Sequence, residues 1–405
     1  MIRNPMKVAF GTMTVTKKSK DMVRRILDSG RVSCGYYVRE FEKRFARLIA
    51  TRQAVAVSSG TDADALALAI FYDFGAKRND EVIVPALSFV ATGNAVLQAG
   101  FKPVFVDIDP KTLNIDTDLI ERAVTKKTRA IMPVHLMGKP AAMDEINHIA
   151  RKHQLFVVED AAEAHGAMYK GRHVGTLGDL GAFSLYVAHI ITSIEGGMVV
   201  TERKDFAEIL RSLRSHGRAC KCEQCVVNIA SASCPKRFQY GAGEDMRFLF
   251  ERIGFSAKMN EIEAAVGLGN LGIYKKILER RRRNLLYLMK RFKKNEEFFY
   301  SIEEESYEKI GPHAFPVVVR RGAPFRRQDL VCFLTQNNID SRSLFSSMPT
   351  QCSGFSFLGH RYGDFPAAEY IGENGLHIGV HQDLGVKHLD YILATFTKFI
   401  KKFTK

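Results

Sequence analysis

Four of the seven cysteines of this chain lie within fifteen residues of one another, at Cys220, Cys222, Cys225 and Cys234. Their spacing is Cys-x-Cys-x2-Cys-x8-Cys, which supplies four local thiolate ligands. Thiolates hold iron–sulfur clusters, and four of them also suit a tetrahedral zinc ion. In a long chain that we expect to be cytoplasmic, such a group favours a metal site over a disulfide framework.

Two other segments place polar side chains where buried strands are expected to end. Residues 58–61 (Ser-Ser-Gly-Thr) leave a strand and open a helix, whose unpaired N–H groups are suited to a phosphate. The same residue types also cap helices for structural reasons alone. Glu159 and Asp160 end another strand, and a buried carboxylate there needs a partner, such as a protonated pyridine nitrogen. A capping Asp beside a surface Glu is the structural alternative.

The elements that must position these residues alternate between short apolar runs and helical patterns over the first 200 residues. Strand, helix, strand in this order is typical of an α/β fold with a mostly parallel central sheet. The continuous apolar runs at 82–84 and 156–158 indicate strands that are buried on both faces. The expected strands are 54–58, 82–85, 103–107, 130–134, 155–160, 181–186 and 197–201, and the expected helices include 61–74, 118–124 and 142–153.

The pattern changes after residue 260. A long helical stretch runs through 264–271 and on to residue 294, and its arginines at 280–283 alternate with leucines in a way that predicts a solvated basic face. A strand at 314–319 and a helix at 389–402 follow. We therefore expect a large α/β domain over residues 1–260 and a small α+β domain over 261–405. The Cys-rich segment, at about 218–240, looks like an insert in the large domain.

The composition is that of an ordinary globular protein, with 46% hydrophobic and 25% charged residues among 405. The net charge of +15 is compatible with nucleic acid, but no zinc-finger or RNA-binding aromatic pattern accompanies it, so we expect no such partner. An anionic small molecule also suits a positive surface. No apolar run approaches the ~20 residues that span a bilayer, and no secretory signal is visible. We expect a cytoplasmic protein without a membrane partner.

The ordered series of motifs resembles the DegT/DnrJ/StrS family, the sugar-modifying branch of the fold-type-I pyridoxal-phosphate (PLP) enzymes. The likeness runs from about Met22 to the C-terminus. It implies a fold-type-I transferase fold and a homodimer, because the family builds each active site from two chains. The matching segments are 35–42 (GYYVREFE), 58–61 (SSGT), 84–89 (VPALSF), 106–109 (VDID), 133–138 (PVHLMG), 159–166 (EDAAEAHG), 175–179 (GTLGD) and 195–198 (EGGM).

The resemblance implies a set of cofactor contacts, position by position. Phe89 would stack on the pyridine ring, and Asp160 would pair with the ring nitrogen and keep it protonated, so that the ring can accept electrons. Ser256 occupies the place where the family usually has an Asn that reaches the phosphate across the dimer interface. The remaining phosphate contacts would come from Gly60, Thr61 and Ser184.

Two departures from the family's aminotransferases point to another reaction. Those enzymes have a Schiff-base lysine before the Glu-Gly-Gly segment, whereas this chain has His189. Imidazole forms no stable imine, but it is a general base with an ordinary pKa of about 6.5. Glu163, which we place among the cofactor contacts, replaces a Gln that is common in aminotransferases. Both features resemble the sugar 3-dehydratases of deoxysugar biosynthesis. In these, pyridoxamine phosphate (PMP) condenses with a nucleotide-linked 4-keto-6-deoxyhexose, a base removes a proton from C4′ of the cofactor, and the sugar's C3 hydroxyl is expelled.

The cysteines separate two kinds of dehydratase within this resemblance. One kind, like CDP-4-keto-6-deoxyglucose 3-dehydrase, adds an iron–sulfur cluster fed by a separate flavin or iron–sulfur reductase, and its Cys-rich insert lies at the same place. In that kind, one cysteine ligand of the cluster stands at the position of Ala162 in this chain. Because that cysteine is absent here, we expect Cys225 to replace it. The other kind, like GDP-4-keto-6-deoxymannose 3-dehydratase, is metal-free and coupled to glutamate, which would leave the cysteines to zinc or to no metal. We expect the first kind. An aminotransferase and a non-catalytic regulator remain alternatives.

Overall fold

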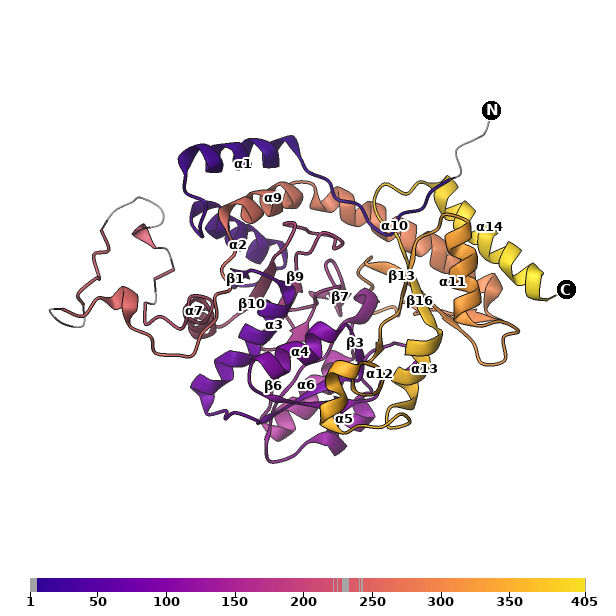
Figure 1. Ribbon diagram of the computed structural model, residues 1–405, viewed down its shortest axis with the longest axis horizontal. Coiled ribbons are helices and arrows are strands. Elements are labelled where there is room, and N and C mark those ends of the chain that lie inside the picture. The colour runs from indigo at the N-terminus through magenta and orange to yellow at the C-terminus, as the bar shows by residue number, and fades with distance from the viewer. Residues whose placement is uncertain are drawn as a thin grey trace.

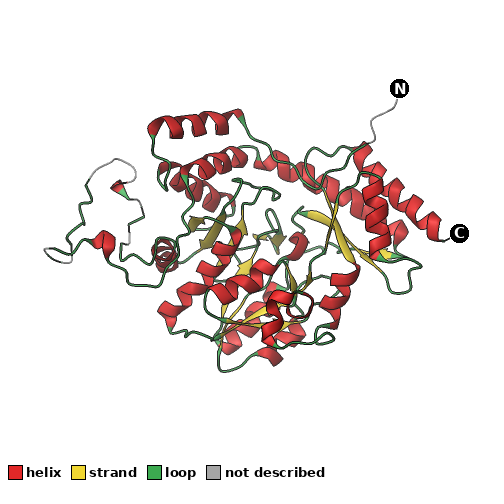
Figure 2. Cartoon of the chain, viewed as in Figure 1, coloured by secondary structure: helices red, strands yellow, loops and turns green. Residues whose placement is uncertain are grey.

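The computed structural model describes residues 6–220, 222–223, 225–227, 233–239, 241 and 243–404. A seven-stranded sheet lies at the centre of the larger part of the molecule, with helices around it (Figures 1 and 2). Each strand expected over the first 200 residues is present in this sheet. In spatial order, its strands are β1 (Gln53–Val57), β10 (Gly197–Thr201), β9 (Leu180–Ser184), β6 (Phe156–Asp160), β5 (Thr128–Ile131), β2 (Glu81–Pro85) and β4 (Lys102–Val106).

The sheet is mostly parallel. The neighbours from β4 across to β9 all run in the same direction, whereas β10 runs antiparallel to both β9 and β1. The expected α/β class with a mostly parallel sheet is therefore confirmed. Because the carboxyl ends of the parallel strands meet at one edge, the loops that follow these strands lie close together there.

Alternate side chains of the strands enter two separate hydrophobic cores, one on each face of the sheet. In β2, Val82 and Val84 belong to one core and Ile83 to the other, and all three are fully buried. The same alternation separates Val157 from Val158 in β6. Continuous apolar runs are thus explained by burial on both sides, as the sequence predicted.

The helices of the first half of the chain pack on this sheet and on one another. The expected helix at 61–74 is an α-helix that continues as a 3₁₀ turn over Ile70–Phe74. A long N-terminal helix, α1 (Lys17–Ser29), lies outside the sheet layer (Figure 1). The other helices are α2 (Tyr36–Leu48), α3 (Gly60–Ala69), α4 (Val90–Gln98), α5 (Thr117–Ala123), α6 (Met143–His153) and α7 (Lys204–Leu213).

A second, antiparallel sheet is formed by the C-terminal third of the chain. Its strands, in spatial order, are β11 (Phe299–Tyr300), β13 (Ala314–Val319), β16 (Gly375–Gly379) and β14 (Ser341–Ser343). The helices of this part are α10 (Tyr274–Phe292), α11 (Arg327–Gln336), α12 (Met348–Gln351), α13 (Pro366–Asn374) and α14 (Val386–Phe403). Two small sheets connect the parts, β12 (Glu308–Lys309) with β7 (Met168–Tyr169) and β8 (Arg172–His173), and β15 (Ser346–Ser347) with β3 (Leu87–Ser88).

The predicted helical stretch that ends near residue 294 consists of two helices. The first, α9 (Glu261–Leu271), packs against α1 and α2, and a break at Gly272 and Ile273 separates it from α10. The predicted solvated basic face of α10 is wrong at one position. Arg281 is only 1% exposed, because the helical period places it on the buried side of α10 with Ile277 and Leu285. The predicted domain division between residues 260 and 261 stays a prediction.

The segment after α7 carries the four clustered cysteines, and its described parts project away from the body, at the left of Figure 1. It returns to the body where Ser215 forms an antiparallel bridge with Ser256. Over the part of the chain that the structure describes, no helix is long and apolar enough to cross a membrane.

Candidate active site

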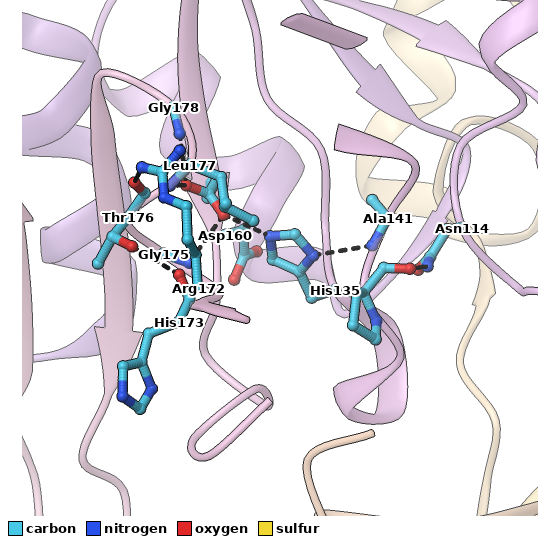
Figure 3. A network of polar contacts seen from close by, with 12 residues as sticks. Asn114, His135, Ala141, Asp160, Arg172, His173, Gly175, Thr176, Leu177 and Gly178 are labelled. Atoms are coloured by element: carbon cyan, nitrogen blue, oxygen red, sulfur yellow. Dashed lines mark hydrogen bonds and ion pairs between the residues drawn. The ribbon is translucent and has the colours of Figure 1, made fainter. Parts of the chain in front are cut away.

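The last two residues of β6 are both buried acids, but they serve opposite faces of the sheet. Glu159 is fully buried, and its carboxylate accepts hydrogen bonds from the N–H groups of Gly175, Leu177 and Gly178 at 2.6–2.7 Å. The Nε2 of His135 lies 3.0 Å from the same carboxylate, and its Nδ1 accepts a bond from the Ala141 N–H (Figure 3). These bonds use the acceptor sites of the Glu159 carboxylate, so its role is to hold the loop at residues 175–178 in place.

Asp160 has fewer protein partners and faces the edge where the strands end. Its carboxylate accepts one bond from the Thr92 hydroxyl at 2.8 Å and one from the Ala162 N–H at 3.1 Å. Thr92 is itself held by Ser88, 2.8 Å away. Burial raises the pKa of Asp160. A buried carboxylate with spare acceptor capacity is suited to a cationic donor, such as a protonated pyridine nitrogen.

The start of α3 provides the predicted phosphate cradle. The Ser59 side chain caps the helix by accepting from the Asp62 N–H, so Gly60 and Thr61 stand in the first turn, where N–H groups have no helical acceptor. A Cβ on Gly60 would lie only 2.7 Å from the Ser184 Cβ. The three residues predicted to hold the phosphate are therefore neighbours, and the turn has no room for a larger residue than glycine.

Phe89 directly precedes α4 and has an unusually open ring. It is 58% exposed, although it is a large apolar residue, and its ring centroid lies 5.6 Å from that of Phe345. It is three residues before Thr92, which contacts Asp160. An exposed aromatic face at this edge of the sheet is available for stacking, as the resemblance implied.

His189 lies in the loop between β9 and β10. The residue as a whole is partly exposed, but its Nδ1 is buried and has no hydrogen-bond partner. Burial, with smaller contributions from His165 and Arg281, lowers the pKa of His189 to about 3. The imidazole is therefore neutral at physiological pH, which is the state that a general base requires.

Glu163 follows β6 by three residues and contacts His313, which precedes β13 of the four-stranded antiparallel sheet. Its Oε2 accepts a bond from the Met137 N–H at 2.8 Å, and its Oε1 lies 3.3 Å from Nε2 of His313. Burial, opposed by the Met137 bond and reinforced by the charge of Asp160, raises the pKa of Glu163 to about 8. Its carboxyl is therefore mostly protonated at neutral pH.

Two residues of this site were missed by the sequence analysis. His313 precedes β13, and its ring centroid is 5.1 Å from that of His189. Arg281 reaches the site from α10, and its Nη2 lies 3.4 Å from the carbonyl of Ala188, next to His189. Its Nε and Nη1 are buried without a hydrogen-bond partner. No local pattern marks either residue, since both come from the C-terminal part of the chain.

The remaining predicted residues are not joined to this group. Ser256 is exposed and pairs through its backbone with Ser215. The thiols of Cys220 and Cys222 lie within hydrogen-bonding distance, and burial followed by this contact raises the pKa of Cys222. Within the described residues, no three His, Cys, Asp or Glu side chains are placed to hold one metal ion. The four cysteines stay a predicted metal site.

The other predicted contacts fit a phosphopyridoxal cofactor. A tight helix start can receive the phosphate, an open aromatic ring can receive the pyridine, and an incompletely satisfied buried carboxylate can receive its nitrogen. The unpartnered Nδ1 of His189 marks the position where aminotransferases of the resembled family have lysine.

Comparison with known proteins agrees with this geometry. Residues 13–397 match the model of the DegT/DnrJ/EryC1/StrS aminotransferase family. The chain belongs to this family. It is 36% identical over 389 residues to a dTDP-4-dehydro-2,6-dideoxy-D-glucose 3-dehydratase of Saccharopolyspora spinosa, covering 92% of this chain and 82% of that protein. It is 32% identical to the GDP-4-keto-6-deoxy-D-mannose 3-dehydratase of Yersinia pseudotuberculosis, covering 95% of this chain and 96% of that protein.

A solved structure extends the comparison to the fold. A crystal structure of GDP-4-keto-6-deoxymannose-3-dehydratase with a trapped PLP-glutamate geminal diamine superposes on this member of the family with a TM-score of 0.84. The two sequences are 28% identical, and the match covers 96% of this chain and 100% of the other. The expected family and its fold-type-I architecture are thereby confirmed.

Proposed function

We propose that this family member is a PMP-dependent nucleotide-sugar 3-dehydratase. The single observation that carries the proposal is the imidazole of His189, whose buried Nδ1 has no protein partner, in place of the lysine that an aminotransferase needs. Bound PMP would supply the amine that condenses with a keto sugar and the ring that accepts electrons. The residues that would hold PMP are Gly60, Thr61, Ser184, Phe89, Asp160 and Glu163, with Ser256 reaching the partner subunit's cofactor across a homodimer interface.

The proposed role of His189 is that of the general base. With PMP and the sugar bound, its Nδ1 would take a proton from C4′, which would allow the C3 hydroxyl of the sugar to be expelled. Asp160 holds the pyridine nitrogen in its protonated form, which the buried setting favours because the two charges then neutralise each other. The Thr92 hydroxyl fixes the direction in which the Asp160 carboxylate points.

An aminotransferase is the less favoured alternative, because it needs a lysine at this point. Lys139 is the one buried lysine in the part of the chain that the structure describes. Its Nζ donates to the Glu303 carbonyl at 2.9 Å and pairs with the carboxylate of Glu308. That ammonium group is therefore engaged elsewhere, and the described residues offer no other buried lysine for the position of His189.

The substrate class follows from the relatives and from charge. Two relatives are named as 3-dehydratases of a dTDP-linked and a GDP-linked keto sugar. A net charge of +15 is favourable for an anionic nucleoside diphosphate. We propose a nucleotide-linked 4-keto-6-deoxyhexose as substrate, in cytoplasmic deoxysugar biosynthesis for a polysaccharide or a glycosylated metabolite. The large domain over residues 1–260 would bind the cofactor.

An iron–sulfur cluster with a reductase partner is the finer form of this proposal, and it rests on the spacing of Cys220, Cys222, Cys225 and Cys234 alone. In the described part of the chain, Cys220 and Cys222 are in hydrogen-bond contact and Cys234 is near enough to act on Cys222 through its charge, but no three ligands are placed to hold one metal ion, so we assign the cluster no step in the reaction. Anaerobically prepared protein would test it. Visible absorption that bleaches with dithionite would support the cluster, whereas cofactor bands alone would favour the glutamate-coupled enzyme, with zinc or no metal on the cysteines.

The decisive experiment compares wild type with His189→Asn and His189→Lys, using PMP and GDP-4-keto-6-deoxy-D-mannose or the dTDP-linked keto sugar as probes. Wild type is expected to form a sugar that lacks the C3 hydroxyl, and His189→Asn is expected to form none. Formation of a 4-amino sugar with its C3 hydroxyl intact by the wild type, with an amino acid as donor, would show an aminotransferase and refute the proposal. His189→Lys is the matched variant in which such an amino sugar is expected to appear.

A further inference from the structure

Two imidazoles, each with a buried Nδ1, face one another in the proposed active site, one from each part of the chain. His189 lies in the loop after β9, and His313 precedes β13. Their ring centroids are 5.1 Å apart, and the planes are inclined at 41°. The Nδ1 atom of each ring is buried and has no hydrogen-bond partner. Buried polar atoms are rarely left unpaired, so these two mark a place for a polar ligand group.

The position of one proton can be worked out from the contacts of Glu163. Its carboxyl is protonated at neutral pH, because burial raises its pKa to about 8. Oε2 accepts from the Met137 N–H, so the proton belongs on Oε1. Oε1 is the atom that lies 3.3 Å from Nε2 of His313.

The tautomer of His313 follows from this contact. Burial, with contributions from His189, Arg281, His377 and His165, lowers the pKa of His313 well below its ordinary value, so the ring is neutral. A neutral imidazole carries one proton, and Nε2 must be free to accept from the Glu163 carboxyl. The ring proton therefore lies on Nδ1, the atom with no protein partner.

We propose that Glu163 and His313 form the general acid of the dehydration, with Nδ1–H of His313 donating to the C3 hydroxyl of the sugar. This inference rests on the proposed function and adds a catalytic residue to it. His189 and His313 then have separate tasks, since one ring receives a proton while the other delivers one. Environments that make one group a base and its neighbour an acid are the usual means of dividing such roles.

The step balances without an external oxidant or reductant. The C3–O bond breaks with its electron pair on oxygen, and that oxygen takes the Nδ1 proton and leaves as water. Nε2 of His313 takes the Oε1 proton of Glu163, which becomes a carboxylate. The proton lost at C4′ would be on His189. The electron pair of that C–H bond would form a double bond to the linking nitrogen, and the π pair between this nitrogen and C4 of the sugar would become the C3–C4 double bond.

The charged neighbours of the pair set its pH dependence. Asp160 lies near Glu163 and favours its protonated form, while Arg281 lies near His313 and opposes protonation of the ring. His165 and His189, in the large sheet's loops, and His377, in β16, also face His313. Cleavage of the C3–O bond is therefore expected to fall as pH rises through about 8, where Glu163 loses its proton.

The first test needs no cofactor. The apoprotein labelled with nitrogen-15 in histidine is examined by NMR, and the His313 signal is assigned by its loss in His313→Gln. We expect a neutral ring protonated on Nδ1 between pH 6 and about 7. A ring protonated on Nε2, or a cationic ring, in that range would overturn the assignment.

The second test separates the two proton transfers. With PMP and GDP-4-keto-6-deoxy-D-mannose, solvent deuterium exchange at C4′ reports the base, and exchange of the C3 hydroxyl oxygen with labelled water reports C3–O cleavage. His313→Gln is expected to keep the first within about threefold and to lose the second by about a hundredfold or more. The control is His153→Gln, which removes an imidazole at the end of α6 that contacts Glu121, outside this site, and is expected to keep both. Retained oxygen exchange in His313→Gln, or equal loss of both exchanges, would overturn the proposal. A wild type that shows neither exchange would overturn the proposed function itself, and this role with it.

Discussion

The protonated state of Glu163 predicts a specific dependence of stability on pH. Its pKa is about 8 when folded, against 4.5 for an ordinary Glu, and its side chain is only 11% exposed. A tenfold change in an ionisation equilibrium is worth about 1.4 kcal/mol, so this difference corresponds to about 5 kcal/mol. Between pH 4.5 and about 8 the folded state binds a proton that the unfolded state has lost. The free energy of unfolding therefore falls with rising pH across this range and levels off above it.

The perturbation is Glu163→Gln, which keeps the side chain's volume, its acceptor for the Met137 N–H and a donor toward His313. We expect the stability of wild type minus that of the variant to fall by up to about 5 kcal/mol between pH 4.5 and 9. Denaturant unfolding of the apoprotein, at constant protein concentration, measures this difference. The contributions of other titrating groups to the free energy of unfolding cancel in the difference between the two proteins. Glu297→Gln, at an exposed position, is the control and is expected to show no such trend. A flat difference for Glu163→Gln would refute the buried, protonated carboxyl.

Four further outcomes are expected. Gly60→Ala places a Cβ 2.7 Å from the Ser184 Cβ, so thermal or denaturant unfolding is expected to show a loss of about 1–3 kcal/mol, and PLP titration is expected to show weaker binding. Asp160→Asn keeps the Thr92 contact but loses the charge, so PLP titration is expected to show at least tenfold weaker binding; unchanged affinity would contradict its role. Glu159→Gln leaves two of its four donors facing an amide NH2 group, because each carboxylate oxygen accepts from two of them. Unfolding is expected to be easier by about 3 kcal/mol, with the C4′ chemistry retained in whatever protein folds. The pKa of His189 is about 3 when folded and 6.5 ordinarily, so between these values only the unfolded state binds the proton. The free energy of unfolding is therefore expected to decrease as the pH is lowered below 6.5, and to decrease less in His189→Asn.

The sequence predicted the strands well because burial on both faces leaves a local record. Apolar runs such as 82–84 are continuous, and they end at turn residues, so the strands could be found one at a time. The order of the strands across the sheet, including the antiparallel placement of β10, depends on contacts between distant segments. No short stretch of sequence carries that information.

Site residues could be predicted only where a local sequence motif contains them. Asp160 ends a strand of the large sheet and His189 follows another, and the family resemblance supplied their expected roles. The different duties of Glu159 and Asp160 could have been inferred from the alternation of side chains along a strand. His313 and Arg281 come from the C-terminal part of the chain, and their neighbours are set by how the two parts pack. A run of four arginines looks solvated in a sequence, whereas the helix turns one of them inward.

The central claim is that His189 removes a proton from C4′ of bound PMP. The most direct measurement is the incorporation of solvent deuterium at C4′ when wild type and His189→Asn are mixed with PMP and GDP-4-keto-6-deoxy-D-mannose. The account predicts exchange that depends on the sugar in wild type, and a loss of at least a hundredfold in His189→Asn. Exchange at the wild-type rate in His189→Asn would contradict it.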